Sequence, residues 1–377
     1  MSVQSAFACI PSYSRFLRLF FLFFERFAVQ AFKASGISLR RSPADNTTAA
    51  LTEDAAALRF VSAPDLSGMA RTRGTCVPIW IPVTVAAALF QCWRTAMQQK
   101  LRHILSVNGA GFVRFLYGAP TALVLLAGAL LATGGKLPAL TGWTLLWATA
   151  GGLTQILATN LLIMAFGFRN FAVGTAYSKT DAAQSAVVAW VLLREAIRPA
   201  AIVGICVGLC GVMTLSLAGR GLKPLDVLAG AVQPAALCGL GSGLLFAFTT
   251  VFIKLGNQSV AAPNVFVRAL FVLVLTNTLQ TVMQGAWLAW REPAELRKAF
   301  TTWRSSSLVG TLSACGSACW FTAFALTEVA LVRSVGQVEI VFTLLFSRFY
   351  LRETLRPGDV AGLVLVVGGV LLIVAGR

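Results

Sequence analysis

Apolar stretches of about 20 residues follow one another from residue 77 to the end of the chain. This is the length that an α-helix needs to cross the hydrocarbon core of a bilayer. Backbone groups inside a bilayer must be hydrogen-bonded within their own segment, so such stretches are expected to be helices. The sequence therefore predicts an all-α polytopic membrane protein with ten transmembrane helices, near residues 77–98, 109–132, 141–166, 171–193, 199–218, 233–254, 262–290, 306–326, 330–351 and 357–376.

The composition excludes a water-soluble fold. Hydrophobic residues make up 57% of the chain and charged residues 12%, whereas soluble domains carry roughly 25% charged residues. The net charge is +17, but the basic residues are scattered without a dense stripe. We therefore assign them to anionic lipid headgroups and expect no nucleic-acid partner. With a single His beside eight Cys, the chain lacks the donors typical of zinc sites, and no metal site is expected.

The apolar stretches form two sets of five that resemble each other. The run 194–199 matches the run 352–357, and in that register Asp181 falls on Glu339, Gly204 on Gly362 and Gly211 on Gly369. Nearer the start of each set, Val113-Arg114 matches Val267-Arg268. Because five spans are an odd number, the second set enters the membrane from the opposite side, and the repeat is inverted. We predict repeat 1 at residues 77–218 and repeat 2 at residues 225–376.

Residues 1–76 differ from the rest and are predicted to be an N-terminal extension outside the helical core. The segment is rich in Arg, and its apolar run at residues 16–27 is broken by charges and too short to span a bilayer. Three interpretations stay open: an interfacial amphipathic helix, a targeting segment, or a stretch that precedes a natural start at Met69. Its basic residues favour cytoplasmic termini.

Two duplicated motifs carry a family resemblance. Leu193-Arg194-Glu195 and Leu351-Arg352-Glu353 each end an apolar run and precede a Gly-rich final helix, and Trp93-Arg94 and Val113-Arg114-Phe115 stand in the first two spans. Over about residues 77–376 this pattern resembles the EamA-like family of the drug/metabolite transporter superfamily. The resemblance implies ten helices in a 5+5 inverted repeat that carry amino acids, nucleobases, sugars or related metabolites, in a bacterial inner membrane.

Ionisable side chains within apolar helices are costly and normally face a cavity or a partner, so they are the candidate site residues. Tyr177, Asp181 and Gln184 share one helical face by their spacing. Asp181 and its counterpart Glu339 are predicted to bind a substrate amine or to carry protons. An internal ion-pair network with Lys179 is the alternative. The predicted cavity set is Tyr177, Lys179, Asp181, Gln184, Gln337, Glu339, Arg94, Arg114 and Arg268. Arg114 and Arg268 either hold an anionic group or extend to headgroups.

The expected function is secondary active export of a small metabolite by alternating access around a midplane cavity. The mixed charges favour an amino-acid-like or other zwitterionic substrate. An integral-membrane enzyme acting on a lipid-like substrate and a channel are the alternatives. The sequence has no Asp-rich motif and no phosphate loop. We therefore expect no enzymatic activity and no cofactor, with proton coupling as an option. The expected partners are the small-molecule substrate and the bilayer. A monomer is the default and a homodimer the alternative.

Overall fold

The computed structural model describes residues 78–101, 104–165, 177–195, 198–217, 234–350 and 357–375. These residues are helical without any strand, which confirms the predicted all-α class. The helices are α3 (Trp80–Leu101), α4 (Val107–Leu116), α5 (Gly118–Thr133), α6 (Gly142–Ala165), α8 (Asp181–Leu193), α9 (Pro199–Leu217), α11 (Pro234–Ser259), α12 (Val265–Arg291), α13 (Pro293–Thr301), α14 (Trp303–Leu326), α15 (Val329–Gly336), α16 (Glu339–Tyr350) and α17 (Pro357–Ala375). The predicted N-terminal extension, residues 1–76, and Glu353 lie outside the described residues.

Long apolar helices dominate the described part of the chain. Five segments there are long and apolar enough to cross a membrane: Val107–Thr133, Gly142–Ala165, Pro234–Ser259, Val265–Arg291 and Trp303–Leu326. Shorter apolar helices cover Asp181–Leu193, Pro199–Thr214 and Val360–Ile373. The protein is thus an integral membrane protein with a polytopic helical fold, while the count of ten spans stays a prediction.

Local sequence explains where several helices begin and end. Ser106 Oγ accepts the N–H of Gly109 at 3.1 Å and caps α4, and the Asn264 side chain accepts the N–H of Phe266 at 2.8 Å and caps α12. Gly134 ends α5 in the left-handed region, where glycine is favoured. Arg194 ends α8 at a φ of 56°, which a residue with a side chain rarely adopts. The chain therefore turns sharply just before Glu195.

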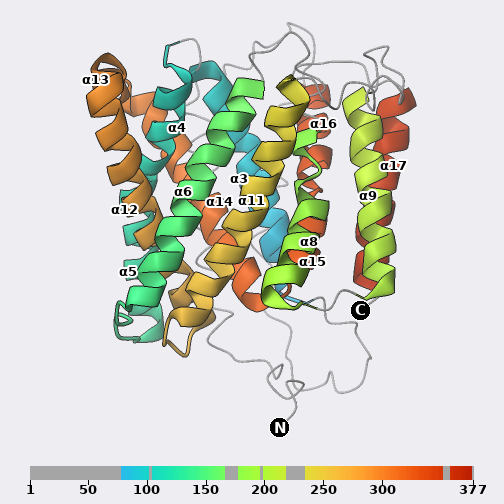
Figure 1. The fold of residues 1–377 in the computed structure, drawn as a ribbon, viewed down its shortest axis with the longest axis horizontal. Coiled ribbons are helices and arrows are strands. Elements are labelled where there is room, and N and C mark those ends of the chain that lie inside the picture. Colours follow the sequence, from blue (N-terminus) through green and yellow to red (C-terminus); the bar gives the residue numbers. More distant parts are fainter. Residues whose placement is uncertain are drawn as a thin grey trace, which may run out of the picture. The chain divides into compact units, whose positions relative to one another are not determined.

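Helix contacts recur between the two sets of five: where two helices pack together, their counterparts in the other set pack together as well. Helix α6 packs against α11, and their counterparts α14 and α3 pack against each other. Helices α5 and α12, and α9 and α17, are contacting pairs in which each member is the counterpart of the other, and α8 packs against α15. Figure 1 shows α6 beside α11 and α9 beside α17. Inverted repeats give this arrangement, and the repeat boundaries themselves stay a prediction.

Glycines set the close approach of α9 and α17. A Cβ added to Gly204 would lie 2.8 Å from the carbonyl oxygen of Gly369, and one added to Gly211 would lie 2.9 Å from that of Gly362. Each glycine therefore meets the repeat counterpart of the other, and the two helices run antiparallel. Small residues let membrane helices approach at backbone distance, because a larger side chain would hold them apart.

Polar side chains join the helices that surround the centre of the protein. Ser242 Oγ on α11 donates to the Ala158 carbonyl of α6 at 2.8 Å, and Asn257 Nδ2 donates to the Phe321 carbonyl of α14 at 3.0 Å. Gln280 Nε2 on α12 donates to the Gly152 carbonyl of α6 at 3.1 Å. Hydrogen bonds of this kind fix the rotation of one helix against the next in apolar surroundings. They thereby determine which side chains face the interior.

Candidate functional site

Two helices are interrupted at corresponding positions in the two sets. In the first set, residues 179–180 form a turn and α8 begins at Asp181. In the second set, residues 337–338 form a turn between α15 and α16, and α16 begins at Glu339. Each carboxylate therefore stands in the first turn of a helix, where the helix dipole stabilises negative charge. Discontinuous helices near the midplane are a recurring way to build a binding site inside a membrane protein.

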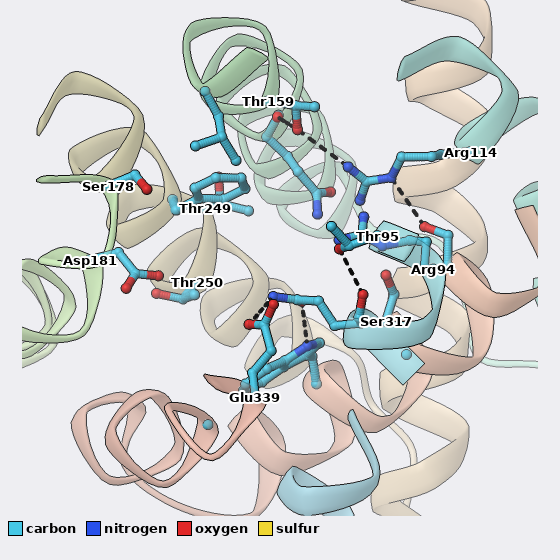
Figure 2. A pocket seen from close by; sticks show the side chains of 18 of the residues that line it. Arg94, Thr95, Arg114, Thr159, Ser178, Asp181, Thr249, Thr250, Ser317 and Glu339 are labelled. Carbon is cyan, nitrogen blue, oxygen red and sulfur yellow. Dashed lines mark hydrogen bonds between the residues drawn. The ribbon is translucent and has the colours of Figure 1, made fainter. Parts of the chain in front are cut away.

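A cavity of about 570 Å³ lies beside these interruptions (Figure 2). Both sets of helices contribute to its wall. The polar lining comes from Gln91, Arg94, Thr95, Gln98, Arg114, Gln155, Thr159, Ser178, Lys179, Asp181, Thr249, Thr250, Ser313, Ser317, Arg333, Gln337, Glu339 and Thr343. Aromatic side chains, among them Phe246, Trp320, Phe321 and Phe324, line other parts of it. The cavity thus combines charged groups with an apolar surface, as small-molecule sites commonly do.

Ion pairs in the cavity wall connect the two sets of helices. Arg333 of the second set donates to Asp181 of the first, and Lys179 of the first lies 3.6 Å from Glu339 of the second. Gln91 Nε2 also donates to Glu339, at 2.7 Å. The guanidinium of Arg333 stacks 5.5 Å from the Trp320 ring centroid. Both carboxylates predicted to lie in the cavity are therefore already neutralised by a cation from the opposite set.

Arg114 and Arg94 have different surroundings from the paired cations. Arg114 is only 7% exposed. Its Nε donates to Ser313 Oγ at 3.3 Å and its Nη1 to Thr159 Oγ1 at 3.4 Å. These partners are neutral hydroxyls, and among the described side chains no carboxylate forms an ion pair with Arg114 or Arg94. Figure 2 shows both Arg residues on the side of the pocket opposite Asp181.

Six of the nine residues predicted for the cavity line it, and three do not. Arg94, Arg114, Lys179, Asp181, Gln337 and Glu339 are in the lining. Tyr177 precedes the turn that interrupts the helix, so the spacing argument that placed it on one face with Asp181 and Gln184 does not apply. The Gln184 side chain instead donates to Thr180 Oγ1 at 2.8 Å and lies against Gly243. Arg268, the counterpart of Arg114, also lies outside the lining.

Sequence reasoning did not single out several lining residues. Gln91, Gln155 and Ser313 are uncharged, and uncharged polar residues are common in membrane helices, so they gave no distinctive signal. Arg333 did give a signal, because it is an ionisable residue within a predicted span. The cost of burying such a residue in a membrane helix, which pointed to Asp181, applies equally to Arg333.

A third ion pair between the two sets lies close in sequence to the cavity lining. Lys254, next to the lining residue Ile253, donates to Glu195 and also to the Thr327 carbonyl at 2.8 Å. The other oxygen of Glu195 accepts the N–H of Val329 at 2.9 Å, at the start of α15. The partner of Glu195 is thus Lys254 of the opposite set, because the turn at Arg194 directs the carboxylate towards α11 and α15.

Metal ligands do not come together in the described part of the chain. No group of three or more His, Cys, Asp or Glu side chains is close enough there to hold an ion. The chemistry of the cavity is therefore described by its charges, hydroxyls and amides.

Comparisons with known proteins agree with this architecture. Residues 233–375 match the model of the EamA-like transporter family, which confirms the resemblance inferred from the sequence for the second set of helices. No curated protein matches the chain. Of 24 chains of solved structures that match, one, described only as a crystal structure of a protein, is 16% identical, with a TM-score of 0.58. The alignment covers 77% of this chain and 96% of that one. At this identity the likeness shows the fold alone.

Proposed function

Since residues 233–375 match the EamA-like transporter family, we propose that the protein is a secondary active transporter that carries a small polar metabolite through the bilayer. We place it in a bacterial inner membrane with cytoplasmic termini. A cavity of about 570 Å³ falls within the roughly 300–1,000 Å³ common for small-molecule sites. The match concerns the second set of helices, and the cavity extends the argument to the first, because both sets line it.

The observation that carries the proposal is the pair of helix interruptions before Asp181 and Glu339. They bring two ionisable residues to one cavity among apolar helices, and the ion pairs of both cross between the sets. Burying such groups in a bilayer costs roughly 2.5–3.5 kcal/mol each on insertion scales, so they are retained where they serve a substrate or ion pathway. A purely structural membrane protein has no need of them.

Alternating access requires contacts between the two sets of helices that form and break. The ion pair of Glu195 and Lys254 is suited to this role, because it ties the end of α8 to α11 and to the start of α15. We expect Glu195→Gln to weaken this closure and to slow transport severalfold. Glu328→Gln is the matched control, since Glu328 is an exposed carboxylate one residue before α15. Equal transport rates for the two variants would remove the pair from the mechanism.

Counterflow in proteoliposomes distinguishes a carrier from a channel. A carrier shows flux that saturates with substrate concentration and is stimulated by unlabelled substrate on the opposite side, because the cavity returns loaded. A channel shows neither property. An enzyme acting on a lipid-like substrate would instead change the lipid composition of the vesicles, which mass spectrometry detects. Flux without saturation or counterflow would overturn the carrier proposal.

Export is the proposed direction. Metabolite profiling of the medium around cells that express the protein, against cells with empty vector, tests it and gives the substrate class. We expect a few compounds enriched only with the wild type. Depletion of compounds from the medium would instead show import.

Proton coupling is the proposed energy source. When the helices move, Asp181 or Glu339 leaves its cation, and a carboxylate without a counter-charge in a desolvated site binds a proton more readily. Flux that follows an imposed pH gradient without a membrane potential supports coupling. Flux indifferent to that gradient contradicts it.

A further inference from the structure

We infer that the cavity takes a small organic anion, with its carboxylate or phosphate group held between Arg94 and Arg114. The inference rests on the proposed transport function, because it specifies the substrate of the same cavity. It replaces the zwitterionic substrate expected from the sequence with an anionic one. The argument follows from which charges in the wall are already paired.

The wall of the cavity carries more positive than negative charge. Its ionisable lining consists of four cations and two carboxylates: Arg94, Arg114, Lys179, Arg333, Asp181 and Glu339. An amino acid would need a free carboxylate for its ammonium group. Asp181 is bound by Arg333, and Glu339 is bound by Lys179 and Gln91. No carboxylate of the lining is left for a cationic group of the substrate.

Arg114 has donors that its protein partners do not use. A guanidinium has five N–H donors in a planar fork that matches the two oxygens of a carboxylate or phosphate. Two of these donors reach neutral hydroxyls, at 3.3 and 3.4 Å, which is long for a hydrogen bond to a charged group. Arg114 is more than nine-tenths buried and still lines the cavity. Its remaining donors are therefore available to a molecule inside the cavity.

Arg94 strengthens the same side of the pocket. Both Arg residues line the cavity, and Figure 2 shows them on the same side of it, so that one ligand can meet both. Arg94 also feels the negative charge of Glu339, which is already bound by Lys179 and Gln91. Two neighbouring cations without their own counter-charges in apolar surroundings are costly, and a bound anion removes that cost.

The remainder of the cavity indicates what else the ligand carries. Gln98, Ser313 and Ser317 supply further hydrogen bonds near the cations, and Trp320 and Phe321 supply an apolar wall. A ligand with one anionic end and a short carbon body uses both surfaces. A large lipophilic cation would meet Arg94 and Arg114 as like charges.

Binding to the purified full-length protein in detergent tests the inference. The probes are succinate for carboxylates, glycerol 3-phosphate for phosphates, glutamine for zwitterions and choline for cations. Thermal shift reports binding through the stability of the protein. Quenching of tryptophan fluorescence also reports it, because Trp320 lines the cavity. We expect one or both anions to stabilise the protein and the other probes to have no effect. Stabilisation by glutamine or choline with neither anion active overturns the inference.

Variants locate the bound anion. Hydrogen bonds to charged groups contribute substantially to the binding free energy. Arg114→Gln and Arg94→Gln should therefore each weaken anion binding about tenfold to a hundredfold. Arg304→Gln is the control, because Arg304 is exposed and stacks on Trp303, away from the cavity. Arg114→Lys keeps the positive charge but lacks the planar fork of donors. Its anion affinity should therefore lie between those of the wild type and Arg114→Gln. If Arg114→Gln fails to fold, Arg94→Gln and the probe panel decide. Unchanged anion affinity in the folded variants overturns the site.

Counterflow with the same probes separates this inference from the transport proposal. If anions bind but are not carried, the anion site stands and the transport function fails. If a neutral or zwitterionic probe shows saturable counterflow while the anions do not bind, transport stands and the anion inference fails.

Discussion

Arg114 and Arg268 occupy matching positions in the two sets of helices, but their surroundings differ. Arg114 is buried and lines the cavity, whereas Arg268 lies outside the lining and its Nε is buried without a hydrogen-bond partner. At the crossing of α9 and α17, by contrast, the two sets are equivalent, because Gly204 meets Gly369 and Gly211 meets Gly362. The two sets thus share their packing, but they do not contribute matching residues to the cavity wall. Two related halves in different conformations are what alternating access requires.

The largest expected effect separates the two Arg residues. Whichever anion binds most tightly, Arg114→Gln should weaken it at least tenfold, while Arg268→Gln should change its affinity by less than about twofold, since only the former removes a charge-assisted hydrogen bond. Calorimetric titration of both variants against the wild type measures this difference. Equal losses would mean that both halves reach the ligand and that the comparison drawn from the cavity lining is wrong.

Asp181 and Glu339 provide the next comparison. Removing one partner of a buried ion pair can cost about 3–5 kcal/mol. Because Asp181 is 22% exposed to the cavity, we expect about 2 kcal/mol for Asp181→Asn. Glu339→Gln should cost about 1 kcal/mol, since it leaves Lys179 32% exposed and therefore hydrated. Chemical unfolding in detergent compares them.

A double variant checks the cause of that loss. Adding Arg333→Gln to Asp181→Asn removes the stranded cation and should restore most of the stability. A double variant that is less stable than Asp181→Asn alone would show that Arg333 acts mainly through its contact with Trp320.

The glycine crossing should show equal effects in both sets. Gly211→Ala and Gly369→Ala each place a Cβ under 3.0 Å from backbone atoms of the facing helix, and each should cost about 1 kcal/mol by forcing the helices apart. Gly128→Ala on α5 is the control, since its added Cβ meets nothing within 4 Å. Thermal unfolding measures all three. A loss confined to one glycine would break the equivalence of the sets at this crossing.

The smallest expected effect is a pH dependence confined to the first set. The start of α4 depends on α13, because Glu295 accepts the Ser106 N–H at 2.6 Å, whereas α12 is capped by its own Asn264. Burial opposes ionisation of Glu295, yet hydrogen bonds from Lys298 and Ser106 hold its pKa below the usual value. Its contribution, about 1 kcal/mol or less, is therefore present above the ordinary pKa of Glu and lost as the pH falls through the lowered one.

Melting temperatures measured from pH 7 down to pH 3 test this contribution. The difference between wild type and Glu295→Gln should shrink as the pH falls. A difference that stays constant over this range would show that the carboxylate charge is not what holds α4.

The sequence predicted the parts of this fold that depend on composition and periodicity. Stretch length predicted the apolar helices, and duplication matched Gly204 and Gly211 to Gly362 and Gly369, the glycines that meet at the crossing of α9 and α17. It did not predict the turn at residues 179–180, because no Gly or Pro marks the interruption. The partners of Asp181 and Glu195 were also not predicted, because each lies on a distant helix, whereas the ion-pair network expected around Lys179 does include Glu339. Which of two matching Arg residues lines the cavity depends on conformation, and both stand in the same Val-Arg pair.

The ion pairs that cross between the sets have a consequence for synthesis of the chain. Asp181 leaves the ribosome before Arg333, 152 residues later, exists. The first five helices therefore enter the bilayer with ionisable groups whose partners have not been made, which is unfavourable in hydrocarbon. Repeat 1 produced alone is expected to insert and fold poorly. The second repeat acts as the folding partner of the first, so a nascent chain stalled between them is a natural substrate for membrane quality control.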